Sequence, residues 1–200
     1  MKFSIILPSR LIPYPGSASF MDQKIIRAIN SVLSQSFQDF ELIVIADGCE
    51  KTKQIVAPLV LDNTNVRLLE CKHKGIFDNL PRNTGIEAAK GEYIIYVDAD
   101  DYWGEDHLKT IEKNLKNYDW VWYNDIVFNG EWIERACNVK SMGGCGTSNV
   151  CHKRSLNLRW GRPGYAHDFH FLQLLLRFPN NTKIETPEYF VCHIPGSVDL

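Results

Sequence analysis

Short apolar runs alternate with amphipathic stretches through the first half of the chain. The apolar runs are rich in β-branched and aromatic residues, which is typical of buried strands, and the stretches between them carry apolar residues at helical spacing. These patterns predict strands at residues 3–7, 40–46, 66–70 and 92–97, and helices at residues 22–34, 52–61 and 81–90. Strands that alternate with helices form a parallel sheet with helices on both faces, so we expect an α/β fold of this kind.

The second half of the chain follows a different pattern. Residues 120–128 alternate polar and apolar side chains and predict one strand, and Asn129 and Gly130 predict a tight turn into a strand at residues 132–136. Residues 143–149 are rich in glycine and predict a flexible polar loop that adds nothing to the core. Further helices are expected at residues 108–115 and 168–178, and a last strand at residues 189–193.

Composition and charge exclude several classes of function. The chain has 200 residues and a net charge of −2, which gives no electrostatic reason to expect a nucleic-acid partner. No apolar run is long enough to span a bilayer, and residues 1–8 are too short for a signal peptide, so we expect a cytoplasmic protein. The cysteines form no C-x-x-C pair, and Cys145, Cys151 and His152 fit no common zinc spacing, so free thiols are expected.

Three carboxylates follow directly after the fourth predicted strand, at Asp98, Asp100 and Asp101. Open α/β sheets bind ligands at the carboxyl ends of their strands, and Ser9 and Asp47 end the first two strands at this same edge. Asp98 and Asp100 are two positions apart, so an extended backbone turns both to one side. Crowded carboxylates repel each other unless a cation neutralises them, and oxygen ligands favour Mg²⁺ or Mn²⁺. The alternative is a solvated acidic turn in which Asp100 or Asp101 caps a helix.

Several groups of residues together carry a resemblance to a known family. They are residues 31–35 followed by 40–44 and 47–48, residues 82–86 followed by 89–94, and residues 97–101. In this order and spacing they resemble a family 2 glycosyltransferase, strongly over residues 2–103 and more weakly at residues 167–168 and 189–197. The resemblance implies the GT-A fold, a Rossmann-like and mostly parallel sheet with a smaller acceptor-side part. Within this single domain, residues 1–103 would bind the nucleotide sugar and residues 104–200 the acceptor.

The resemblance also assigns roles to individual residues. It implies a nucleotide pocket of Pro8, Ser9, Asp47, Lys74, Asn83 and Asp98, a metal site of Asp100 and His193, and sugar or acceptor contacts from Asp101, Thr147 and Ser148. Asp168 would be the general base that takes the proton from the acceptor hydroxyl. The alternatives are a helix N-cap for Asp168, a core or edge histidine for His193, a solvated loop for Lys74 and a plain turn former for Asp47.

Members of this family take a sugar from a nucleotide diphosphate, use a divalent metal and invert the anomeric carbon. We therefore expect a UDP-sugar donor, Mn²⁺ or Mg²⁺ as cofactor, and a glycan or lipid-linked acceptor in polysaccharide assembly. Peripheral contact with the inner face of the membrane is compatible with these expectations. The sequence departs from the family at Arg10, Ala46 and His167, where a Tyr or Asn, an acid and a second acid are usual.

Other functions stay open at this point. A GT-A-like scaffold could bind nucleotide sugars without catalysis, although it would not need an intact acidic run at residues 98–101 together with Asp168. A sugar-nucleotide pyrophosphorylase shares the general architecture, but residues 9–13 lack the glycine-rich phosphate loop of that class. An NAD enzyme is disfavoured because no G-x-G-x-x-G follows the first strand.

Overall fold

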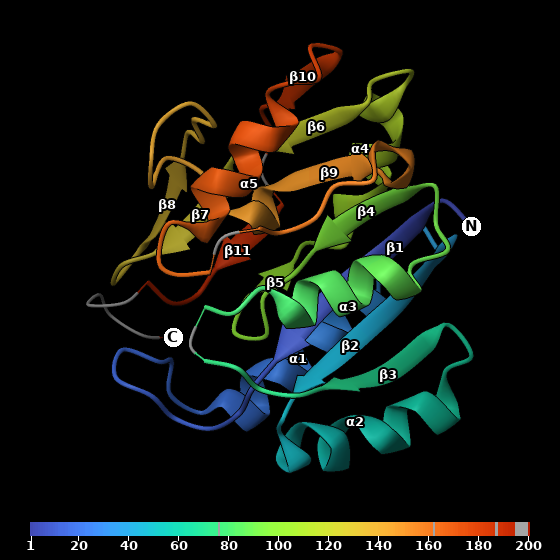
Figure 1. Cartoon of the computed structure of the whole chain (residues 1–200), viewed down its shortest axis with the longest axis vertical. Coiled ribbons are helices and arrows are strands. Elements are labelled where there is room, and N and C mark those ends of the chain that lie inside the picture. Colours follow the sequence, from blue (N-terminus) through green and yellow to red (C-terminus); the bar gives the residue numbers. More distant parts are fainter. Residues whose placement is uncertain (76, 162, 187, 195–199) are drawn as a thin grey trace.

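The computed structural model describes residues 1–75, 77–161, 163–186, 188–194 and 200. Its centre is a sheet of seven strands in the order β10-β6-β9-β4-β1-β2-β3 (Figure 1). These strands are β1 (Phe3–Ser9), β2 (Phe40–Asp47), β3 (Val66–Cys71), β4 (Tyr93–Tyr96), β6 (Trp120–Tyr123), β9 (Val150–Lys153) and β10 (Asn181–Ile184). The first four predicted strands are confirmed, and they run parallel to one another.

Helices cover both faces of the large sheet, as predicted (Figure 1). On one face lie α1 (Met21–Leu33), α2 (Glu50–Asp62) and α4 (His107–Leu115), and on the other lie α3 (Leu80–Ala88) and α5 (His167–Leu175). In β1, Ile5 and Leu7 belong to the core under the first set of helices, whereas Ile6 belongs to the core under the second set. A strand that is buried on both faces must be apolar at successive positions, which is why these strands can be predicted from the sequence.

A second sheet of four strands adjoins the first, in the order β5-β11-β7-β8. Its strands are β5 (Tyr102–Trp103), β7 (Asp125–Phe128), β8 (Trp132–Arg135) and β11 (Tyr189–Val191). The prediction of one strand over residues 120–128 is wrong, because the chain leaves the large sheet at Asn124 and enters the small one. The buried Asn124 side chain stabilises this break: its Oδ1 accepts the Cys137 N–H at 3.0 Å, and its Nδ2 donates to the Glu185 carboxylate at 3.0 Å. The predicted turn at residues 129–130 does join two antiparallel strands, β7 and β8.

Strand β9 has no apolar alternation that would reveal it in the sequence. It lies antiparallel between β4 and β6, so it joins the first half of the chain to the second within one sheet. Its His152 is buried, and a ring nitrogen lies 2.9 Å from the Tyr96 hydroxyl. Burial lowers the pKa of His152 to about 4, so the ring is neutral in the core.

The segment before β9 also differs from the prediction of a flexible loop over residues 143–149. Its last three residues form a short 3-10 helix, Thr147–Asn149, and their side chains are buried. The Asn149 amide donates to the Tyr123 carbonyl at 3.2 Å and to the Asp125 carboxylate at 3.1 Å. Polar residues of this kind look like a loop in the sequence because their partners come from distant strands.

Two glycines allow the chain to approach the sheet closely around α3. A Cβ atom at Gly85 would lie 2.6 Å from Cγ2 of Ile6, and one at Gly91 would lie 2.5 Å from the backbone nitrogen of Ser4. A larger residue at either position would push α3 or the turn after it away from the sheet. The close approach also places Arg82, in the first turn of α3, at the carboxyl edge of the sheet.

The six cysteines are all free thiols. Across the part of the chain that the structure describes, no helix combines the length and the apolar character needed to cross a membrane.

Candidate functional site

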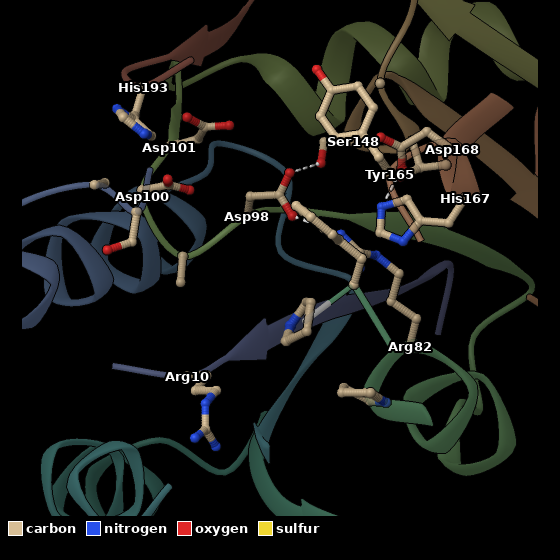
Figure 2. A pocket seen from close by; sticks show the side chains of 18 of the residues that line it. Arg10, Arg82, Asp98, Asp100, Asp101, Ser148, Tyr165, His167, Asp168 and His193 are labelled. Atoms are coloured by element: carbon tan, nitrogen blue, oxygen red, sulfur yellow. Dashed lines mark hydrogen bonds and ion pairs between the residues drawn. The ribbon is translucent and has the colours of Figure 1, made fainter. Parts of the chain in front are cut away.

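A cavity of about 690 Å³ opens at the carboxyl ends of β1, β2 and β4. It is lined by ten of the predicted residues: Pro8, Ser9, Asp47, Asp98, Asp100, Asp101, Thr147, Ser148, Asp168 and His193. In Figure 2, Asp98 lies between Asp100 and His193 on one side and His167 and Asp168 on the other. The topology therefore brings residues from both halves of the chain to one place, as parallel strands with a shared edge require.

Two predicted nucleotide contacts do not reach the cavity, Lys74 and Asn83. The Asn83 amide bonds instead to the backbone of Trp160, donating to its carbonyl at 2.9 Å and accepting its N–H at 2.9 Å. These paired bonds fix the segment at residue 160 against α3. Lys74 is exposed to solvent in the loop after β3.

The end of β2 presents a carboxylate in a fixed position. One oxygen of Asp47 lies 2.7 Å from Nδ1 of His73, and the Arg10 guanidinium donates to the Asp47 backbone carbonyl at 3.0 Å. At the end of β1, the Ser9 hydroxyl lies 3.0 Å from the hydroxyl of Thr52 in α2. Within the described residues, no carboxylate forms an ion pair with Arg10, so its guanidinium adds positive charge to this part of the cavity.

The turn after β4 carries the first two acids of the predicted acidic run. The Asp98 carboxylate is held from two sides, by Nη2 of Arg82 at 3.1 Å and by the Ser148 hydroxyl at 2.5 Å. Arg27 donates to the backbone carbonyl of Asp100 at 2.8 Å, which fixes the turn. Burial, together with the negative charge of Asp98, raises the pKa of Asp100 to about 6. The carboxylates of Asp98 and Asp100 therefore repel each other, and a cation bound between them would relieve the repulsion.

Asp101 connects this turn to the small sheet. Its carboxylate accepts the Tyr189 hydroxyl at 2.8 Å and the Cys192 N–H at 2.9 Å. The Tyr189 oxygen in turn accepts the backbone N–H of Asp98 at 3.2 Å. Burial and the charges of Asp100 and Asp98 raise the pKa of Asp101. These bonds give Asp101 a supporting position behind the acids that face the cavity.

Asp168 stands in the first turn of α5, where its side chain is 36% exposed. One of its oxygens accepts the Thr147 hydroxyl at 2.6 Å and lies 3.2 Å from Nε2 of His167. Burial alone raises the pKa of Asp168, but the hydrogen bond and charge of His167, the charge of Arg82 and the Thr147 hydroxyl outweigh burial and lower it. Asp168 is therefore ionised at neutral pH. The alternative role as N-cap is not observed, because Ala166 holds that position.

His193 follows β11 and lines the cavity on the side of Asp100. Its Nε2 lies 2.9 Å from the backbone carbonyl of Gly16, so it also holds the proline-rich loop after β1. Pro195, Gly196 and Ser197, which contribute to the resemblance, lie outside the described residues.

Other cavity residues were not assigned a role from the sequence. Arg82 lies within a motif that the resemblance uses, and its guanidinium stacks 4.8 Å from the ring centre of Trp160. Arg135 forms an ion pair with the buried Asp125. Tyr165 stands before α5 in a stretch without periodic pattern. Only Arg82 had a sequence signal, its place in the motif, because Arg135 and Tyr165 lie outside the residues that carry the resemblance.

The chemistry of the site suits a cation and a substrate with phosphate groups. Among the described residues, no group of three His, Cys, Asp or Glu side chains is placed to hold a metal ion. Asp100 nevertheless offers a hard oxygen donor, and burial together with the charge of Asp98 raises its pKa. Asp168 offers an ionised proton acceptor across the same cavity.

Comparison with known sequences agrees with the resemblance. The family model described as Glycosyl transferase family 2 matches residues 21–179. The glycosyltransferase GlyG of Streptococcus pneumoniae is 30% identical over 114 residues, which are 56% of this chain and 36% of GlyG. The matched part of this chain thus spans about a third of that relative.

Comparison with solved structures agrees with the predicted GT-A fold. S. aureus TarS, solved in complex with UDP-GlcNAc, has a TM-score of 0.75 at 20% identity, over 96% of this chain and 58% of that one. The mannosyltransferase PcManGT from Pyrobaculum calidifontis, solved with GDP-Man and Mn²⁺, has a TM-score of 0.69 at 14% identity, over 98% of this chain and 58% of that one. At these identities the likeness establishes the fold.

Proposed function

Because the chain belongs to glycosyl transferase family 2, we propose that it transfers a sugar from a nucleotide diphosphate to an acceptor hydroxyl, with inversion at the anomeric carbon. One observation carries this proposal: the cavity sets the acidic turn at Asp98 and Asp100 opposite the carboxylate of Asp168. The acidic side suits a metal-bound diphosphate, and the other side suits removal of a proton. The transferred sugar would lie between them.

We assign the donor's nucleotide to the carboxyl ends of β1 and β2. Pro8 and Ser9 would line its pocket, Asp47 would accept a ring N–H of the base, and Asp98 would contact the ribose. Support for a UDP-sugar comes from the likeness to TarS, which was solved with UDP-GlcNAc. Lys74 and Asn83 are not part of this assignment, since neither lines the cavity.

We assign a divalent cation, Mn²⁺ or Mg²⁺, to Asp100 and His193. The fit rests on the oxygen donor of Asp100 and on its raised pKa, which a cation would reverse. Such ions commonly complete their coordination with water and substrate phosphates, so few protein ligands are needed. When bound, the ion would stabilise the negative charge of the departing diphosphate. PcManGT, which shares the fold, was solved with Mn²⁺.

In this proposal Asp168 is the general base. Its ionised carboxylate would take the proton of the acceptor hydroxyl as that oxygen attacks the anomeric carbon from the face opposite the diphosphate. Thr147 and Ser148, for which the resemblance implies sugar or acceptor contacts, donate hydrogen bonds to Asp168 and Asp98. They would thus orient the base and the donor-binding acid.

The assignment divides the single domain by function. Residues 1–103 would bind the donor, and residues 104–200, which supply Asp168, would bind the acceptor. The acceptor would be a glycan or a lipid-linked sugar in polysaccharide assembly. The protein would act in the cytoplasm, with peripheral contact at the inner face of the membrane.

A thermal-shift series tests the donor and the metal together. The chain is heated with UDP, GDP, CMP or dTDP, each with and without Mn²⁺. A ligand that binds only the folded state raises the melting temperature, by an amount equivalent to about 2.7 kcal/mol at a hundredfold excess over its Kd. We expect a shift with UDP that requires Mn²⁺ and that disappears in Asp100→Ala.

Asp62→Ala is the matched control, because Asp62 is an exposed acid at the end of α2, away from the cavity. It should keep the full shift. A shift that does not need Mn²⁺ would contradict the metal assignment, and a shift with GDP alone would contradict the choice of UDP. No shift with any nucleotide would contradict donor binding altogether.

A further inference from the structure

One aromatic side chain in the wall of the cavity is exposed to an unusual degree. Tyr165 is 80% exposed, although it lines the cavity together with Asp168, three residues further along the chain. In Figure 2, Tyr165 lies on the same side of the cavity as His167 and Asp168. Ligand pockets are lined largely by apolar and aromatic side chains, so an exposed aromatic ring in the wall of this cavity is a candidate ligand contact.

A second aromatic residue from another loop supports this ring. Phe77 packs edge-on against Tyr165, with 5.9 Å between ring centres, and against His167 at 5.7 Å. The Phe77 carbonyl also accepts the N–H of Gly164 at 3.2 Å, which ties the two loops together. Phe77 has a φ of 59°, a left-handed conformation that costs energy for a bulky side chain. Strain of this kind persists only where surrounding contacts impose it. The fold therefore holds Phe77 in a fixed position against Tyr165.

The surroundings of the ring match a sugar better than a lipid chain. A pyranose has an apolar face of C–H groups and a rim of hydroxyls, so it can cover an aromatic ring and hydrogen-bond at its edge. Asp168 and Thr147 line the same cavity as Tyr165 and offer polar atoms to the hydroxyls of a ligand there. A lipid chain seated there would desolvate these polar groups without replacing their hydrogen bonds.

We propose that Tyr165, supported by Phe77, is the platform on which a pyranose ring of a glycan acceptor stacks, with its attacking hydroxyl turned toward Asp168. The inference rests on the proposed function and deepens it, because it selects a ring sugar as the acceptor group. Tyr165 is then a specificity residue and takes no part in the chemical step.

Saturation-transfer NMR on the full chain tests the platform without knowledge of the natural acceptor. The sample contains UDP, Mg²⁺ and one of the methyl pyranosides of glucose, galactose or N-acetylglucosamine. We expect transfer to the C–H protons of at least one pyranoside. Its binding should weaken about five- to tenfold in Tyr165→Ala, the size expected for one ring contact, and should persist in Tyr165→Phe.

Phe20→Ala is the matched control, because Phe20 is 75% exposed and does not line the cavity. It should bind the pyranoside as the unmodified protein does. The UDP signals of the same sample report donor binding separately, so their loss would overturn the proposed function, whereas their persistence isolates the acceptor platform.

Three results would overturn the platform while UDP still binds. The first is equal pyranoside binding in Tyr165→Ala and the unmodified protein. The second is no transfer to any pyranoside. The third is Tyr165-dependent binding to phosphatidylglycerol vesicles without pyranoside binding, which would make Tyr165 a membrane contact.

Discussion

The large sheet carries buried acids at both of its ends, and the two ends differ in how the acids are neutralised. At the amino end, Glu41 accepts hydrogen bonds from the Ser4 hydroxyl, the Arg67 guanidinium and the Lys90 N–H, each at 2.7 Å. At the carboxyl end, the acids at residues 98–101 crowd into one turn, where Asp100 has no ion pair among the described residues.

The pKa values express the same contrast. Burial raises the pKa of Glu41, but its bonds to Ser4, Arg67 and Lys90 and the charge of Arg67 outweigh burial and lower it. Burial and mutual repulsion raise the pKa of Asp100 to about 6. The chain supplies every partner of Glu41, which indicates a structural role, whereas Asp100 keeps a raised pKa and lines the cavity, a position that suits a bound cation.

The largest expected effect is the loss of the proposed base at the carboxyl end. In Asp168→Asn, the rate of UDP release by transfer of the sugar to water should fall about 10²- to 10⁴-fold, because the amide cannot take the proton of the attacking hydroxyl. The melting temperature should change little, since the amide keeps the shape of the side chain. The measurement is the initial rate of UDP release at saturating donor, together with a thermal melt.

Asp62→Asn serves as the control for an acid outside the cavity, and it should keep the full rate. If Asp168→Asn released UDP at more than a tenth of the normal rate, the base would have to be another group. The carboxyl end of the sheet would then no longer differ from the amino end by holding the catalytic acid.

The next effect is on stability and belongs to the amino end. Glu41→Gln should lower the free energy of unfolding by about 2 kcal/mol, because Arg67 loses its charged partner in a buried network. Urea unfolding measures this loss, and UDP binding should not change. Glu70→Gln is the matched control, since Glu70 pairs with Lys53 at an exposed site where ion pairs contribute little. Equal stability of the two variants would show that the Glu41 network contributes no more than a surface pair.

The smallest effect is the change with pH in the stability difference between the unmodified protein and Glu41→Gln. The pKa of Glu41 is lowered in the folded state, so the unfolded chain binds more protons as the pH falls. The stability difference between the unmodified protein and Glu41→Gln should be complete above pH 4.5, the ordinary value for this group, and should shrink below it. Unfolding curves from pH 7 to pH 3 measure the difference. A difference that stays constant down to pH 3 would mean that the charge of Glu41 does not stabilise the fold.

Most of the parallel part of the fold was predictable because three of its strands, β1, β2 and β4, are buried on both faces. An unbroken run such as Ile5 to Leu7 has no other stable environment in a protein of this size. The break at Asn124 and the strand β9 were not predictable, since the buried Asn124 and His152 are satisfied by Cys137, Glu185 and Tyr96 from other segments. Sequence patterns report the burial of apolar residues and say little about polar residues with distant partners.

The residues of the candidate site also fall into those that could be predicted from the sequence and those that could not. The residues at the strand ends converge because parallel strands share an edge, so Asp47 and Asp98 could be placed together from the topology alone. Asn83 lies in a recognisable motif, yet its amide holds Trp160 and does not line the cavity. No sequence pattern predicts the contact between Phe77 and Tyr165, because the two residues are 88 positions apart and their rings meet only in the folded protein.

The position of β9 has a consequence for the order in which the chain can assemble during synthesis. β4 and β6 are complete by residue 123, but their facing edges stay unpaired until residues 150–153 emerge and enter between them. Unpaired strand edges are templates for association with other chains. The growing polypeptide therefore passes through an interval in which two strand edges of the future sheet have no partner from their own chain.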